Sequence, residues 1–168
     1  MNCLKTFTIL LLLSGCVEVG FRSPQPVKGK ELDRIPSEII QFYTEQTKDS
    51  ISKKSSQFDV SYLGDEFNKD GVLSEKTILK HWKGRYFLNQ KKDSLWYIVM
   101  IVPVGKNNYE AYKMDGGNEK TVKILRSITK VDEVYSEKGK LELVIIDPSK
   151  SEFKRIMKSD AFEKIDIF

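Results

Sequence analysis

The chain has 168 residues, and its 28 lysines and arginines against 24 acidic residues give a formal net charge of +4. This length suffices for one domain with its own hydrophobic core. Lysines and acidic residues interleave along the chain, so no single basic face is expected, and this pattern argues against nucleic acid as a partner.

The first 15 residues are typical of a signal peptide. Lys5 supplies a positive start, and the apolar stretch that follows ends in the run Leu10–Leu13. This stretch is much shorter than the roughly 20 apolar residues that a permanent membrane-spanning helix requires. We therefore expect residues 1–15 to be removed from the mature protein.

A cysteine ends this leader, in the sequence Leu13-Ser14-Gly15-Cys16. These four residues resemble the lipobox of bacterial lipoproteins. The resemblance implies that the Cys16 thiol receives a diacylglyceryl group, that the chain is cut after Gly15, and that the new amine is acylated. Two or more acyl chains hold a protein stably on a bilayer. Cys16 is thus the predicted lipid-attachment site. The alternatives are an ordinary secretory signal or an uncleaved anchor, with Cys16 there by chance.

The resemblance also bears on location and on cysteine chemistry. Position 17 is Val rather than Asp, so by resemblance to lipoproteins of Gram-negative bacteria the outer membrane is favoured, on its periplasmic or its surface face. Cys3 lies in the discarded peptide, and with Cys16 alkylated no thiol remains for a disulfide, for catalysis or for a metal.

Residues 16–32 contain Gly20, Pro24, Pro26 and Gly29 and show no clear period. We read them as a lipidated cysteine followed by a flexible tether. An alternative places Val17, Val19 and Phe21 in the membrane interface. A single domain is expected over residues 33–168.

Three helices are predicted in this domain. Pro36 suits the first turn of a helix over residues 36–48. Ser74 and Gly84 suit the two ends of a short helix over residues 75–83. Ser149 and Glu152 form a capping box that opens a helix ending near residue 158.

The remaining apolar runs are typical of strands separated by short turns. The run over 95–104 does not alternate, so we expect a central strand that is buried on both faces. The other strands are predicted at residues 85–90, 109–114, 120–126, 128–135, 140–146 and, as a last edge strand, 161–168. The predicted fold is α+β: an antiparallel β-meander of about five to seven strands, with an N-terminal helix and a capped C-terminal helix packed on it.

No catalytic, cofactor-binding or metal-binding residue is predicted. The segment Glu66–Gly71 has the alternating oxygen side chains of a calcium loop, but position 77 is Thr where a bidentate Glu is needed. We read it as a surface turn. His81 is the only histidine and is interpreted as structural, because the sequence supplies neither a nucleophile nor an orienting carboxylate for it.

Two functions remain in competition. The first is a non-catalytic envelope module that binds the membrane through Cys16 and recognises an envelope protein or a glycan. The second is a small cell-envelope hydrolase that works through carboxylates. The globular part loosely resembles small lipoproteins of unknown function, and this resemblance adds no active-site residues.

Overall fold

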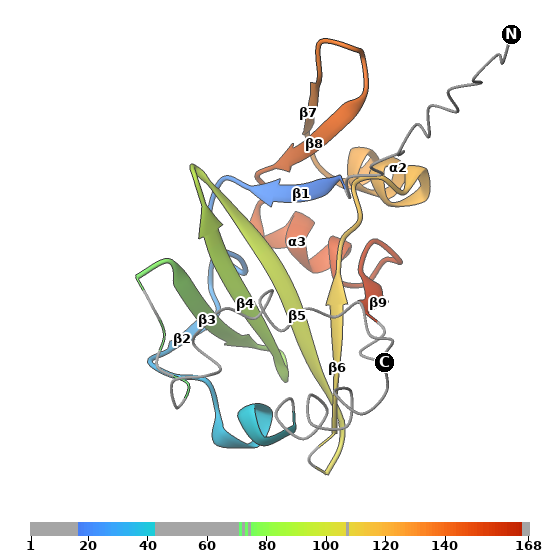
Figure 1. Ribbon diagram of the computed structural model, residues 1–168. Coiled ribbons are helices and arrows are strands. Elements are labelled where there is room, and N and C mark those ends of the chain that lie inside the picture. The colour runs from blue at the N-terminus through green and yellow to red at the C-terminus, as the bar shows by residue number, and fades with distance from the viewer. Residues whose placement is uncertain (1–16, 43–70, 72, 74, 107, 166–168) are drawn as a thin grey trace, which may run out of the picture.

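A computed structural model of the chain describes residues 17–42, 71, 73, 75–106 and 108–165. The α+β prediction is confirmed, with nine strands in one open sheet and three helices (Figure 1). The strands are β1 (Glu18–Phe21), β2 (Lys30–Leu32), β3 (Thr77–Trp82), β4 (Arg85–Lys92), β5 (Leu95–Gly105), β6 (Asn108–Lys113), β7 (Val131–Tyr135), β8 (Leu141–Ile146) and β9 (Glu163–Ile165). The helices are α2 (Glu119–Ile128), α3 (Lys150–Ile156) and an earlier one described over residues 37–42.

The long strand β5 is the centre of the sheet. The strand order is β2-β3-β4-β5-β1-β8-β7, and β6 also pairs with β5 and carries β9 on its other side. Side chains at Ile98 and Met100 belong to one buried cluster, and those at Val99 and Ile101 belong to another. Because successive side chains of a strand point to opposite faces, both faces of β5 are buried, as predicted.

Helices cover these two faces. On one face, α2 and α3 contribute Leu125 and Phe153, and the Phe153 ring packs at an edge against Phe21 and Phe87. On the other face, Ile39 of the helix at 37–42 and Ile35, two residues before that helix, belong to the second cluster. The core is therefore divided by the sheet into two layers.

The predicted tether is wrong over the described residues 17–32. β1 lies inside the sheet, antiparallel to β5 and parallel to β8, and Val19 and Phe21 are buried. The same burial excludes Val19 and Phe21 from a membrane interface. The physical reason is that Val17, Val19 and Phe21 alternate with smaller or polar residues and supply the apolar side chains that the sheet interior needs.

The loop after β1 is fixed by buried polar contacts. The Asn89 side chain accepts from the Gln25 N–H at 2.7 Å and donates to the Gln25 carbonyl at 2.8 Å. Lys80 donates to the carbonyls of Pro24 and Pro26. Burial lowers the pKa of Lys80, and Glu31 partly offsets this effect. The segment Pro24–Pro26 is therefore held in place by side chains of β3 and β4.

Two predicted elements have the wrong type. Residues 77–82 form the strand β3 instead of a helix, because a two-residue turn at Lys83 and Gly84, both with positive φ, pairs them with β4. Residues 119–128 form the helix α2 instead of a strand, because Asn118 caps its first turn and Thr121, Val122 and Leu125 bury one helical face.

The other predicted elements in the described residues are confirmed: β4, β5, β6, β7, β8, the edge strand β9 and α3 with both bonds of its capping box. The strand count is nine rather than five to seven, and the parallel pair β1–β8 departs from a purely antiparallel meander. Residues 66–70 of the rejected calcium loop and the end of the first predicted helix lie outside the described residues.

Candidate functional site

The sheet divides along one edge of β5. β4 pairs with the opposite edge over most of the strand, from Leu95 to Ile101. On the dividing edge, Trp96 pairs with Phe21 of β1, whereas pairing with β6 begins at Met100. Within the described registers, residues 97–99 have no strand partner on this side. We call this opening between β1 and β6 the sheet fork.

The open end of the sheet fork is bounded by a second contact between its two branches. Glu18 and Asp115 form an isolated antiparallel bridge, and the Gly116 N–H donates to the Val17 carbonyl at 2.8 Å. Asp115 also accepts from the Gly117 N–H at 2.8 Å, which shapes the turn into α2. Residues 115–118 thus connect β6 to the helix α2.

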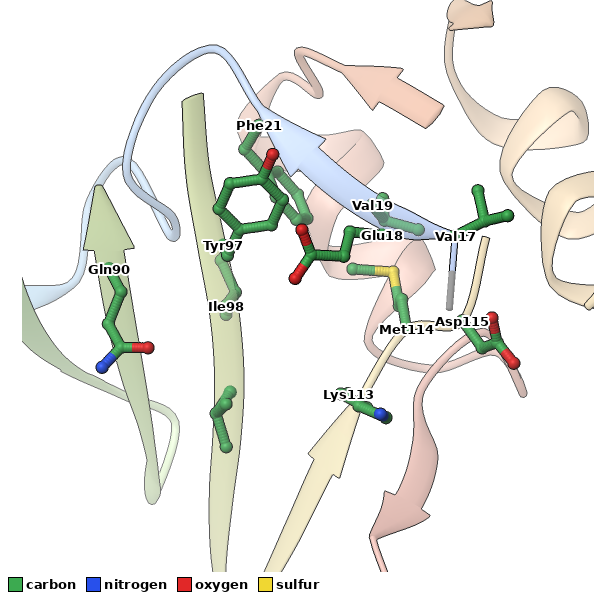
Figure 2. Close-up of a pocket in the computed structure, with 11 residues that line it drawn as sticks. Val17, Glu18, Val19, Phe21, Gln90, Tyr97, Ile98, Lys113, Met114 and Asp115 are labelled. Carbon is green, nitrogen blue, oxygen red and sulfur yellow. The ribbon is translucent and has the colours of Figure 1, made fainter. Parts of the chain in front are cut away.

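A pocket occupies the sheet fork (Figure 2). Its volume is about 70 Å³. Small-molecule sites usually measure about 300–1,000 Å³, whereas one water needs roughly 10–15 Å³ of such space. The pocket therefore has room for a few waters or for one small group of a larger ligand.

The lining of this pocket is mixed. Its apolar part comes from β1, β5 and the residue after β6, and its polar part comes from the same elements and from β4. The apolar residues are Val17, Val19, Phe21, Ile98, Val99 and Met114, and the polar ones are Glu18, Gln90, Tyr97, Lys113 and Asp115. A group bound here would meet hydrocarbon and hydrogen-bonding side chains at once.

The polar groups of the pocket are partly fixed by neighbours. The Glu18 carboxylate lies 3.5 Å from the Lys92 ammonium, and the same ammonium lies over the Tyr97 ring. Burial raises the pKa of Tyr97, and the negative charge of Glu18 raises it further. A tyrosine hydroxyl is protonated at neutral pH, and both effects favour that protonated form in Tyr97, whose side chain lines the pocket.

The two carboxylates of the pocket do not face each other. Figure 2 shows the Glu18 carboxylate pointing toward Tyr97 and the Asp115 carboxylate pointing away from it. Asp115 is also engaged by the Gly117 N–H. A carboxylate pair for glycoside cleavage needs both groups directed at one bond, and this arrangement does not provide that.

Neither His81 nor the adjacent acids Asp132 and Glu133 belong to the lining of this pocket. His81 is on β3 instead of a helix, with its ring 4.9 Å from the Tyr86 ring. Asp132 and Glu133, adjacent acids on β7, have lowered pKa values because Arg22 and Lys130 bond the first and Tyr135 and Arg126 bond the second. Cys16 lies outside the described residues, directly before the pocket residue Val17.

Two further observations concern the described part of the chain only. No three side chains among its His, Cys, Asp and Glu residues gather into a cluster that could hold a metal ion. No helix within it has the length and apolar character needed to span a bilayer.

Sequence reasoning missed the pocket because it assigned Val17, Glu18 and Val19 to a tether. The alternation of Val17, Val19 and Phe21 was the available signal for a strand, but no sequence signal shows that β1 and β6 separate along β5. Comparisons with protein-family models, with curated proteins and with solved structures find no match for this chain.

Proposed function

We propose that the protein is an envelope lipoprotein, anchored in the outer membrane through Cys16, whose domain is a non-catalytic binding module. Its ligand site is the pocket of the sheet fork. One observation carries the proposed ligand site: apolar side chains, Tyr97 and the stretch of β5 without a strand partner on this side, residues 97–99, meet at one pocket. A strand edge without a ladder partner can bond a ligand through its backbone groups.

The pocket favours binding over hydrolysis. The carboxylates of Glu18 and Asp115 point in different directions, and the Asp115 carboxylate accepts a hydrogen bond from the Gly117 N–H in the turn into α2. The pocket volume of about 70 Å³ suits one small group, such as a short alkyl end beside a polar atom, presented by a larger envelope molecule.

The anchor is tested by metabolic labelling with a palmitate analogue and by membrane fractionation. Wild-type protein should be labelled and should sediment with membranes, whereas Cys16→Ala should lose both properties. Cys3→Ala is the matched control, because Cys3 belongs to the leader, and it should label like wild type. Equal labelling of Cys16→Ala and wild type would contradict the anchor.

The pocket is tested by methyl NMR during a titration with 1-butanol, a probe with one short alkyl group and one hydroxyl. We expect saturable shifts at Ile98, Val19 and Met114 and none at Leu79, which lies on the other face of the sheet. Val19→Phe should fill the pocket and abolish these shifts. The control Val27→Phe changes a valine that is 55% exposed and should preserve them. Unsaturable or unselective shifts would contradict the site.

A further inference from the structure

The proposed anchor and the observed position of β1 together restrict how the domain can sit on a membrane. Val17 is buried in the fold, with its carbonyl bonded to the Gly116 N–H. Consecutive Cα atoms are about 3.8 Å apart, so a lipid on Cys16 holds the bilayer next to the start of β1. No spacer separates the lipid from the folded domain.

The β7–β8 hairpin extends past this point. β8 runs parallel to β1 and places Leu143 level with Glu18. The hairpin turn at residues 136–140 precedes Leu143 and therefore lies on the side from which the chain enters β1. At about 3.3 Å per residue, Leu141 at the start of β8 lies roughly 7 Å beyond the level of Glu18, and the turn at 136–140 lies beyond Leu141. The Cα of Cys16 can lie at most roughly 8 Å beyond Glu18.

This hairpin exposes apolar side chains that packing does not explain. Tyr135 and Val134 are 54% and 41% exposed, and they are two of the four large hydrophobic side chains left exposed in the described residues. Lys138 and Lys140 lie in the turn beside them, together with Glu137. Tyrosine with neighbouring lysines is the composition typical of a membrane–water interface, where rings and lysine stems contact the acyl boundary and charges meet phosphate groups.

The hairpin is also held in a defined position. Its turn is closed by bonds from the Ser136 N–H to the Lys140 carbonyl at 2.8 Å and from the Gly139 N–H to the Ser136 carbonyl at 2.9 Å. The Tyr135 hydroxyl donates to Glu133, which is paired with Arg126 of α2. Figure 1 shows the β7–β8 hairpin standing out from the sheet at the end opposite the β5–β6 turn.

We propose that the tip of the β7–β8 hairpin, with Tyr135, Val134 and Lys138, docks into the headgroup region of the bilayer that carries the lipid of Cys16. This rests on the proposed lipid anchor. The tip and the anchor form two points of attachment, and they fix one orientation of the domain on the membrane.

The experiment uses the full lipidated protein reconstituted into vesicles of phosphatidylethanolamine and phosphatidylglycerol. Tyr135→Cys and Lys138→Cys provide single thiols for an NBD fluorophore, because the lipid occupies the thiol of Cys16. Val104→Cys is the matched control, since Val104 is also 54% exposed and lies in the last residues of β5, beside the opposite turn.

Doxyl groups carried high on the acyl chains should quench NBD at positions 135 and 138 roughly twofold or more over position 104, because only immersed probes approach them. Lys138→Cys keeps Tyr135 in place and covers the case in which Tyr135→Cys disturbs the hairpin. Equal quenching at all three positions in protein that carries palmitate and sediments with vesicles would overturn the docking alone. Protein without palmitate would overturn the anchor first, and the docking with it.

Discussion

The Gly116 N–H donates to the Val17 carbonyl at 2.8 Å, which ties the residue before β1 to the turn that opens α2. This bond closes the sheet fork at the end away from β5. It also requires a close approach of two backbones, because a Cβ built on Gly116 would lie 2.9 Å from Val17 Cγ1 and 3.1 Å from the Glu18 carbonyl oxygen.

Gly116→Ala should therefore destabilise the fold by about 1–3 kcal/mol, the usual cost of overpacking a tight contact. Denaturant unfolding measures the loss, and faster hydrogen exchange at residue 116 would locate it at the fork. Gly105→Ala is the control, since the nearest atom to its added Cβ is at 3.7 Å. If Gly116→Ala were as stable as wild type, the close approach of the two backbones at Gly116 and Val17 would not be needed for stability.

Asn89→Ala should be among the most damaging polar substitutions. The Asn89 side chain is fully buried and satisfies both the N–H and the carbonyl of Gln25. Buried groups left without a partner cost about 1–3 kcal/mol each, so we expect a loss of about 2–4 kcal/mol. Thermal and denaturant unfolding measure it. The exposed Asn108→Ala should change stability by less than about 0.5 kcal/mol, and similar losses for the two variants would refute this role of Asn89.

Phe153→Ala should destabilise the protein by about 3–5 kcal/mol, because it removes a fully buried ring from the core. This ring joins α3 to β1 and β4 through its edge contacts with Phe21 and Phe87, at centroid distances of 6.3 Å and 5.6 Å. A weaker near-ultraviolet circular dichroism signal and a lower unfolding midpoint would show this destabilisation. The exposed Val104→Ala should leave both observables nearly unchanged.

Acid should weaken the attachment of β9 to β6. A hydrogen bond from Lys164 and another from Tyr112 lower the pKa of Glu110 below its usual value of 4.5. Since the unfolded chain binds this proton more readily, the stabilisation is complete above about pH 4.5 and is lost as the pH falls through the lower pKa of the folded state.

Glu110→Gln should consequently show a smaller fall of the unfolding midpoint between pH 7 and pH 3 than wild type. Thermal unfolding across this range measures the difference. Glu142→Gln, at an exposed position of β8, is the matched control and should follow the wild-type curve. Parallel curves for Glu110→Gln and wild type would exclude the proposed role of this ion pair.

The sequence predicted an element correctly where its local pattern of apolar and capping residues fits only one type of secondary structure. The capping box of Ser149 and Glu152 marks α3, and the unbroken apolar run of β5 marks a strand buried on two faces. In both cases the pattern depends on neighbours along the chain, so it can be read without knowledge of the fold.

The errors occurred where one pattern fits two structures. Ile78, Leu79 and Trp82 have helical spacing, but the turn at Lys83 and Gly84 pairs them with β4. Thr121, Val122 and Leu125 fit the face of a helix, and the capping role of Asn118 was the signal for it. The pocket required knowledge that β1 joins strands distant in sequence, which no local pattern contains.

The position of β1 in the interior of the sheet also has a consequence for biosynthesis. Its partners are β5 and β8, so Glu18 cannot meet Leu143 until nearly the whole domain has been synthesised. Pairings between such distant segments form slowly. During this interval Val19 and Phe21 belong to a strand that is synthesised first but can join the sheet only late. The newly synthesised chain therefore carries an unpaired apolar segment until β5 and β8 are available to pair with it.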